Sequence, residues 1–97
     1  MHAAALRVEL RIPTARSLKE KRRVLKAVQH RLADTFPVAV GEVGFQDQWQ
    51  RATLGVALVA AQASQLERVI GAVQRALHDV AEVDLLEIGV AYLEEET

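Results

Sequence analysis

Leu6-Arg7-Val8-Glu9-Leu10-Arg11-Ile12 alternates apolar and charged residues without interruption. This strict period of two predicts a strand with one buried face, because successive side chains of a strand point to opposite sides of its sheet. Pro13 has no backbone N–H to donate and ends the strand. We expect the four apolar residues of this stretch to face the core and its three charged residues to face away from it.

A helix follows directly. Ser17 precedes Glu20 by three residues, the spacing of a capping box, in which each side chain binds the other residue's backbone N–H. Apolar residues then recur at helical spacing up to Pro37 and define the buried face, namely Leu18, Leu25, Val28, Leu32 and Phe36. Lys21 falls inside this apolar stripe. Because burying an ammonium group is unfavourable, we expect Lys21 to lie at the helix edge and to extend past the sheet rim into solvent.

The next segments predict two strands joined by a short turn. Val38 and Val40 have one parity and Val43 and Phe45 the other, so we expect a bulge near Gly41 that turns both pairs inward. The turn is expected at residues 46–48. The strand after it would face the core with Ala52, Leu54, Val56, Leu58 and Ala60.

The last third of the chain predicts a second helix and a fourth strand. Ser64 and Glu67 have the spacing of a second capping box. The helix behind it has Leu66, Val69, Ile70, Val73, Leu77 and Val80 at helical spacing, and Leu86, Ile88, Val90 and Tyr92 alternate in the final strand.

This order of elements predicts an α+β fold of the ferredoxin-like type, β-α-β-β-α-β. Right-handed crossovers place both helices on one face of an antiparallel four-stranded sheet of order 4-1-3-2. We expect a single domain over residues 1–97, since this length and 51% apolar residues are sufficient for one core.

The composition favours a cytoplasmic protein. The chain has no cysteine, which excludes thiolate metal sites and a thiol nucleophile and agrees with a reducing compartment. No stretch resembles a secretory signal or is long enough to span a membrane, so we expect no membrane contact. Asparagine is absent and Met1 is the only methionine; such scarcity is a tendency of thermophiles, although seven glutamines oppose it.

The charge is distributed unevenly along the chain. Residues 7–31 hold nine basic and two acidic residues, a net charge of +7, whereas the residues after Arg31 hold three basic and eleven acidic residues, a net charge of −8. A basic half attracts polyanions and speeds their encounter with the protein.

One stripe of the first helix carries Lys19, Arg22, Arg23, Lys26 and His30. Like charges three and four residues apart destabilise a helix by about 0.2–0.5 kcal/mol per pair, and an anionic partner would remove this penalty. The stripe can equally be a solvated face that serves solubility or pairs with the acidic residues 94–96.

The expected topology brings residues 46–51 to the start of this helix, because the first strand ends at the sheet edge where the third begins. Trp49 and Arg51 would lie on the helix-free side of the sheet, where an exposed Trp among arginines suits base stacking or a cation–π contact. Packing of Trp49 over the hairpin, or a dimer contact, explains it as well. The candidate nucleic-acid-binding residues are Arg7, Arg11, Arg16, Lys19, Arg22, Arg23, Lys26, Trp49 and Arg51.

The sequence offers no catalytic constellation. His2, His30 and His78 fall at the N-terminus and on two different helices, without metal-ligand spacing, and there is no Gly-rich phosphate loop. We therefore expect a protein that is not an enzyme and that needs no metal or cofactor. The open sheet face lacks the two or three aromatic residues on which RNA-recognition surfaces stack bases. Any contact with RNA is therefore expected to involve mainly the sugar–phosphate backbone of the RNA.

Two stretches, Arg16–Leu25 with the block SLKEKR and Gln46–Gly55 with the block QDQWQRA, resemble the uncharacterised bacterial family typified by YlxP. The resemblance extends over nearly the whole chain. It implies a ferredoxin-like domain of unknown function, whose genes often lie among those for transcription termination, translation initiation and ribosome maturation. It thus implies a link to RNA or ribosomes and supplies no activity.

The leading hypothesis is a non-enzymatic module that binds RNA or a ribosomal subunit, as a monomer or a weak homodimer. One alternative is a homo-oligomeric protein-interaction module that uses the open sheet face, with Val59, Leu85 and Leu93 as apolar contacts. A small-molecule regulatory domain and a small phosphate-handling enzyme are further alternatives.

Overall fold

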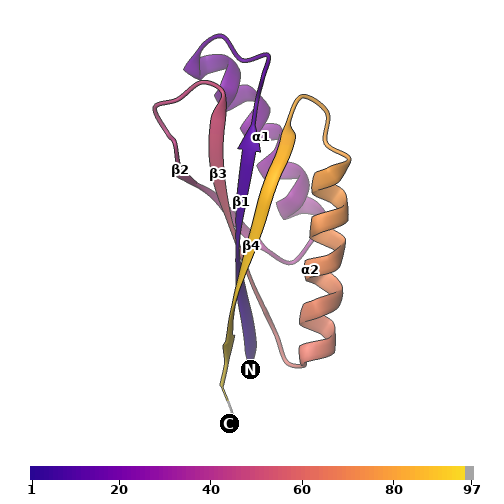
Figure 1. Cartoon of the computed structure of the whole chain (residues 1–97). Helices are drawn as coiled ribbons and strands as arrows, with labels where there is room; N and C mark the ends of the chain where they lie inside the picture. Colours follow the sequence, from indigo (N-terminus) through magenta and orange to yellow (C-terminus); the bar gives the residue numbers. More distant parts are fainter. Residues whose placement is uncertain (96–97) are drawn as a thin grey trace.

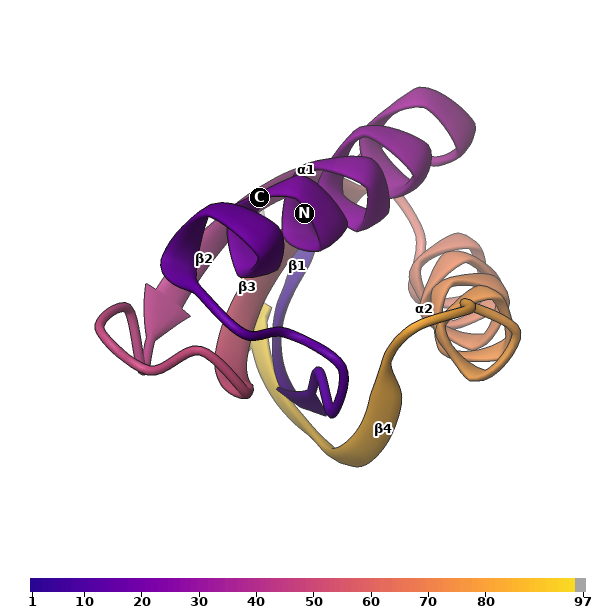
Figure 2. The ribbon, with the colours of Figure 1, turned by 90° about the horizontal axis from the view of Figure 1, so that it is seen from above.

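The structure is a computed structural model that describes residues 1–95. The chain forms β1 (His2–Arg11), α1 (Leu18–Thr35), β2 (Ala39–Gly44), β3 (Arg51–Ala60), α2 (Ala63–His78) and β4 (Asp84–Glu94). The strands form one antiparallel sheet in the order β2-β3-β1-β4, and both helices lie on the same side of it (Figures 1 and 2). The predicted ferredoxin-like fold and strand order are confirmed.

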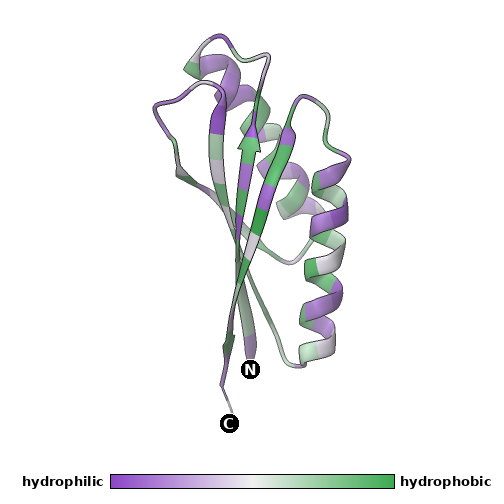
Figure 3. Cartoon of the chain, in the orientation of Figure 1, coloured by the Kyte–Doolittle hydropathy of each residue, from purple (hydrophilic) through white to green (hydrophobic). Residues whose placement is uncertain are grey.

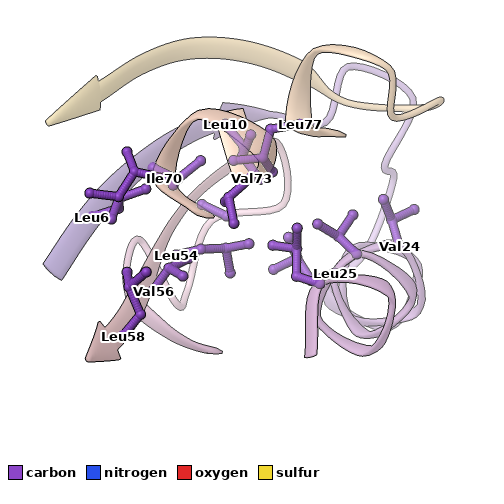
Figure 4. Packing of buried hydrophobic residues seen from close by; sticks show 14 of the residues in the cluster. Leu6, Leu10, Val24, Leu25, Leu54, Val56, Leu58, Ile70, Val73 and Leu77 are labelled. Atoms are coloured by element: carbon purple, nitrogen blue, oxygen red, sulfur yellow. The ribbon is translucent and has the colours of Figure 1, made fainter. Parts of the chain in front are cut away.

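The hydrophobic core lies between the sheet and the helices. On β1, Leu6, Val8 and Leu10 are at most 1% exposed, and Ala52, Leu54 and Val56 of β3 are buried beside them. The helices contribute Val24, Leu25, Val28 and Leu32 from α1 and Leu66, Ile70, Val73 and Leu77 from α2. Figure 4 shows labelled members of this cluster from β1, β3 and both helices. The sequence periodicity predicted most buried positions of β1, β3 and both helices, but it missed Val24 of α1.

The molecule is elongated, with extents of 48 × 22 × 20 Å. β1, β3 and β4 continue past α1 toward the end where both termini lie (Figure 1). The opposite end gathers the β1–α1, β2–β3 and α2–β4 connections. The N-terminus of α1 and the β2–β3 loop therefore belong to the same end of the molecule.

The two helices begin differently. At α1 the Ser17 hydroxyl accepts the N–H of Glu20 at 3.1 Å, as predicted. The Glu20 carboxylate accepts the N–H of Arg16 at 2.6 Å, one residue before the position that a capping box uses. The predicted second box is wrong: α2 begins at Ala63 with Gln62 as its N-cap and no side-chain cap bond, because its first turn starts before Ser64.

β2 contains a bulge, but two residues later than predicted. Glu42 pairs with Leu54 and Gly44 pairs with Thr53, so Val43 is the extra residue. The Val43 side chain lies on the open face over Gly55. If residue 55 had a Cβ atom, that atom would lie 3.1 Å from Val43 Cγ1. The predicted inward orientation of Val43 and Phe45 is therefore wrong, and both side chains are exposed.

β4 has a similar irregularity opposite β1. Glu9 pairs with Glu87 and Leu10 with Leu85, which leaves Leu86 as the extra residue. Leu85 consequently packs against the core, while Leu86 is 45% exposed. The sequence predicts the opposite orientation, with Leu86 toward the core and Leu85 on the open face. The alternation of Val90, Ile88 and Leu86 continues without a break and gives no sign of a bulge at Leu86.

Candidate functional site

Lys21 is the buried charge of the α1–β2 contact. Its side chain is 1% exposed, its Nζ atom donates to the Phe45 carbonyl at 2.6 Å, and it forms an ion pair with Glu42 Oε2 at 3.0 Å. The predicted snorkelling of Lys21 into solvent is wrong, because β2 supplies both partners inside the fold. Glu42 lies two residues after Val40, so both side chains point to the same, inward side of β2. This spacing was the one signal in the sequence for an acidic partner of Lys21.

Lys21 also fixes the start of the β2–β3 loop. Phe45 has a positive φ of 57°, which ends β2 and leaves its carbonyl beside the first turn of α1. The carbonyl accepts a second bond, from the Gln48 N–H at 3.0 Å. The loop therefore begins at a fixed distance from α1.

The far end of the same loop is held by Gln50. Its side-chain amide donates to the carbonyls of Pro13 and Ala15 at 3.1 and 3.2 Å, and its own carbonyl accepts the Ile12 N–H at 2.9 Å. Both ends of the β2–β3 loop are thus tied to α1 or to the segment that leads into it. Trp49 lies between these anchors with its side chain half exposed.

The basic residues of α1 lie on its outer side, as expected for the stripe. Lys19, Arg22 and Lys26 are exposed and form no ion pair with another described residue. Arg23 pairs with Glu82 at 3.2 Å, and both of these side chains are largely exposed. Figure 3 shows the hydrophilic character of α1 and of the adjoining loops at this end of the molecule.

Four of these cations converge on one shallow hollow between α1 and β2. The hollow has a volume of about 450 Å³ and is lined by Lys19, Arg22, Arg23, Leu25, Lys26, Gln29 and Glu42. Its single carboxylate, Glu42, is already paired with Lys21. The hollow therefore carries an excess of positive charge that the fold itself leaves open to an anion.

The arginines of β1 lie elsewhere. Arg7 and Arg11 project from the open face of the sheet, away from α1, and each has a partner: Arg7 pairs with Glu9 at 3.3 Å and Arg11 with Asp84 at 3.1 Å. Glu9 also accepts the Thr53 hydroxyl at 2.5 Å. This part of the predicted interface is separated from the α1 stripe and largely neutralised within the chain.

The remaining candidates lie at the junction of the two groups. Arg51 is the register partner of Arg11, and its guanidinium stacks on the Phe45 ring with Cζ 4.5 Å from the ring centroid. Arg16 is exposed in the segment before α1. The fold thus brings Arg16, Trp49 and Arg51 to the end of the sheet where α1 begins.

Residues 1–95 contain no cluster of three His, Cys, Asp or Glu side chains that could hold a metal ion. The pKa of Tyr92 is raised above its ordinary value of 10.0, because its hydroxyl donates to the Glu67 carboxylate. Neither α1 nor α2 is long and apolar enough to cross a lipid bilayer.

Comparison with known proteins places the chain in a family. Residues 3–90 match the model of a family described as "Protein of unknown function (DUF503)". The chain belongs to the DUF503 family. An "Uncharacterized protein YlxP" of Bacillus subtilis (strain 168) is 39% identical over 70 residues, which are 72% of this chain and 76% of that protein. The predicted family resemblance is thereby confirmed.

Among solved structures, the DUF503 chain is similar to the "De novo designed protein Foldit4". The TM-score is 0.52 at 11% sequence identity, over 97% of this chain and 99% of the designed one. At this identity the likeness concerns the fold alone. None of these names states an activity.

Proposed function

We propose that this protein is a non-enzymatic cytoplasmic module that binds RNA, free or in a ribosomal subunit, through phosphate contacts of α1. The observation that carries the proposal is the exposed, unpaired state of Lys19, Arg22 and Lys26 beside the hollow they share with Arg23. A phosphate in this hollow would meet several cations without displacing a partner from any of the three.

Local energetics support an external partner. Arg22 lies three residues after Lys19 and four before Lys26, and each such like-charge pair destabilises the helix by about 0.2–0.5 kcal/mol. Lys19 also lies in the first turn, where a positive charge opposes the helix dipole at a cost of about 0.3–1 kcal/mol. A polyanion bound along α1 would neutralise these cations and so remove both penalties.

Co-sedimentation with ribosomal subunits at low and high salt tests the proposal. The wild-type protein is expected to sediment with a subunit at low salt and to be released at high salt, because phosphate contacts depend on released counterions. The double reversal Arg22→Glu/Lys26→Glu should abolish association at low salt.

A matched control is available on the other helix. Arg68→Glu/Arg75→Glu changes the net charge by the same amount at two exposed positions of α2. This variant should retain association. If both double variants bind as the wild type does, the basic stripe is only a solvated surface and the proposal is refuted.

A second candidate function is self-association through the open sheet face. Val59 and Leu93 are 68% and 60% exposed there, and both are register partners of Ala3. Leu85, expected to contribute, faces the core instead. Light scattering at high protein concentration tests this candidate: a dimer that Val59→Lys dissociates would support it, and a monomeric wild type would refute it.

A further inference from the structure

Trp49 belongs to the β2–β3 loop, at the end of the molecule where the basic stripe of α1 begins. The loop that carries Trp49 is fixed at Phe45 by Lys21, which belongs to the first turn of α1, and at Gln50 by the carbonyls of Pro13 and Ala15. The Trp49 side chain is 51% exposed. A half-exposed aromatic residue therefore lies at the end of the molecule where the basic stripe begins.

Of the two aromatic rings at this end, Trp49 is more exposed than Phe45. The chain has four aromatic residues. One face of the Phe45 ring is covered by Arg51, and Phe36 packs against the core at the C-terminus of α1. Tyr92 is the register partner of Ala4, far along the sheet from Arg11 and Arg51. Trp49 thus offers the more open stacking position at the end of the molecule that carries the basic stripe.

The basic stripe, in contrast, provides several phosphate contacts in a fixed arrangement. Lys19 and Lys26 are seven residues apart on one helix, so their Cα atoms are separated by roughly 10 Å along its axis. A rigid row of cations matches phosphates that are already held at regular spacing, as in a duplex, better than those of a flexible strand, which must be ordered on binding. Single-strand binders also use several stacked bases, whereas this end has two aromatic rings, one of them partly covered by Arg51.

We propose that the preferred ligand is a duplex RNA that ends in an unpaired nucleotide, with the duplex backbone on the α1 stripe and the unpaired base stacked on Trp49. This inference rests on the proposed function and adds the class of RNA to it. The base would lie against the exposed indole, while Arg16 and Arg51 border the same end of the sheet.

Three RNAs with equal numbers of phosphates test the inference by fluorescence anisotropy at one salt concentration: a blunt hairpin, a hairpin whose stem is one base pair shorter and carries a two-nucleotide overhang instead, and an unstructured strand. The hairpin with the overhang should bind about 5- to 150-fold more tightly than the blunt one, the range that one base–aromatic stack contributes. Trp49→Ala should reduce its affinity to that of the blunt hairpin and leave the blunt hairpin unaffected. Trp49→Phe should retain most of the preference.

Tyr92→Ala is the matched control, because Tyr92 is 53% exposed and lies at the other end of the sheet. It should leave all three affinities unchanged. Equal binding of the two hairpins, tighter binding of the unstructured strand, or equal effects of Trp49→Ala on all three RNAs would overturn the inference while the proposed function stands. Failure of every RNA to bind at low salt would refute the proposed function, and the inference with it.

Discussion

Replacing Lys21 by methionine should destabilise the fold strongly, although Lys21 is a charged residue on a helix. Methionine keeps the length and packing of the buried aliphatic stem and removes the ammonium group. The Phe45 carbonyl then loses its charged donor at 2.6 Å, an interaction that contributes about 1.5–3 kcal/mol. The Glu42 carboxylate loses its ion-pair partner at 3.0 Å.

The size of the second effect depends on the exposure of Glu42. Removal of one partner from a fully buried pair costs about 3–5 kcal/mol, and surface pairs contribute about 0–1 kcal/mol. The Glu42 side chain is 22% exposed, so water partly solvates the stranded carboxylate. We expect Lys21→Met to lower the free energy of unfolding by about 2–4 kcal/mol in total. The melting temperature should fall by about 10–25 °C.

Urea denaturation followed by circular dichroism measures this change. Lys26→Met is the control, since Lys26 is exposed on the same helix, and it should change the free energy of unfolding by less than about 0.5 kcal/mol. The double variant Lys21→Met/Glu42→Met should recover the part of the lost free energy of unfolding that is due to the unpaired carboxylate. Replacement of both partners of a buried pair by apolar residues is often neutral. A loss below about 0.5 kcal/mol for Lys21→Met itself would refute the reasoning.

Three further predictions test the local structure. Ser17→Ala should lower the free energy of unfolding by about 1 kcal/mol through loss of the α1 cap, whereas Ser64→Ala should stay within about 0.5 kcal/mol; equal losses in urea denaturation would contradict this assignment of the cap. Leu85→Ala should destabilise the fold by about 2 kcal/mol and Leu86→Ala by less than about 0.5 kcal/mol, and the reverse order would contradict the position of the β4 bulge. Ultraviolet titration of the single tyrosine should give a pKa above 10.0 that Glu67→Gln lowers. Because the raised pKa reflects a bond to the protonated phenol, its stabilising effect is complete at neutral pH and is lost as pH rises through that pKa; an unchanged pKa in Glu67→Gln would contradict the contact.

The sequence was informative where one rule acts over several consecutive residues. The alternation from Leu6 to Ile12 and the helical spacing around Leu25 and Val73 predict buried faces that the structure confirms. The order of elements then determined the strand order, because crossover handedness leaves few arrangements.

Bulges could not be located from the same patterns. A bulge adds one residue and inverts the alternation, and two neighbouring residues can each be the extra one. At Leu85 and Leu86 both candidates are leucines, so hydropathy does not distinguish them. At Val43 the choice depends on space over Gly55 in a different strand.

The candidate site was predicted in composition but only partly in arrangement. The stripe of α1 followed from helical spacing alone. The ion pairs of Arg7 and Arg11 on the open face depend on side-chain geometry and on the β1–β4 register, which places Asp84 beside Arg11. The partners of Lys21 depend on a positive φ at Phe45, a conformation that no sequence pattern around Phe45 indicates.

The central claim is that exposed cations of α1 bind RNA phosphates, and the salt dependence of RNA affinity tests it most directly. For the wild type, the logarithm of the association constant should fall linearly with the logarithm of salt concentration, by about 0.7–0.9 per phosphate contact. Arg22→Glu/Lys26→Glu removes two contacts, so it should flatten this slope by about 1.4–1.8 and weaken binding to every RNA sequence alike. A slope that is identical in the wild type and in this variant, at equal affinity, would contradict the claim.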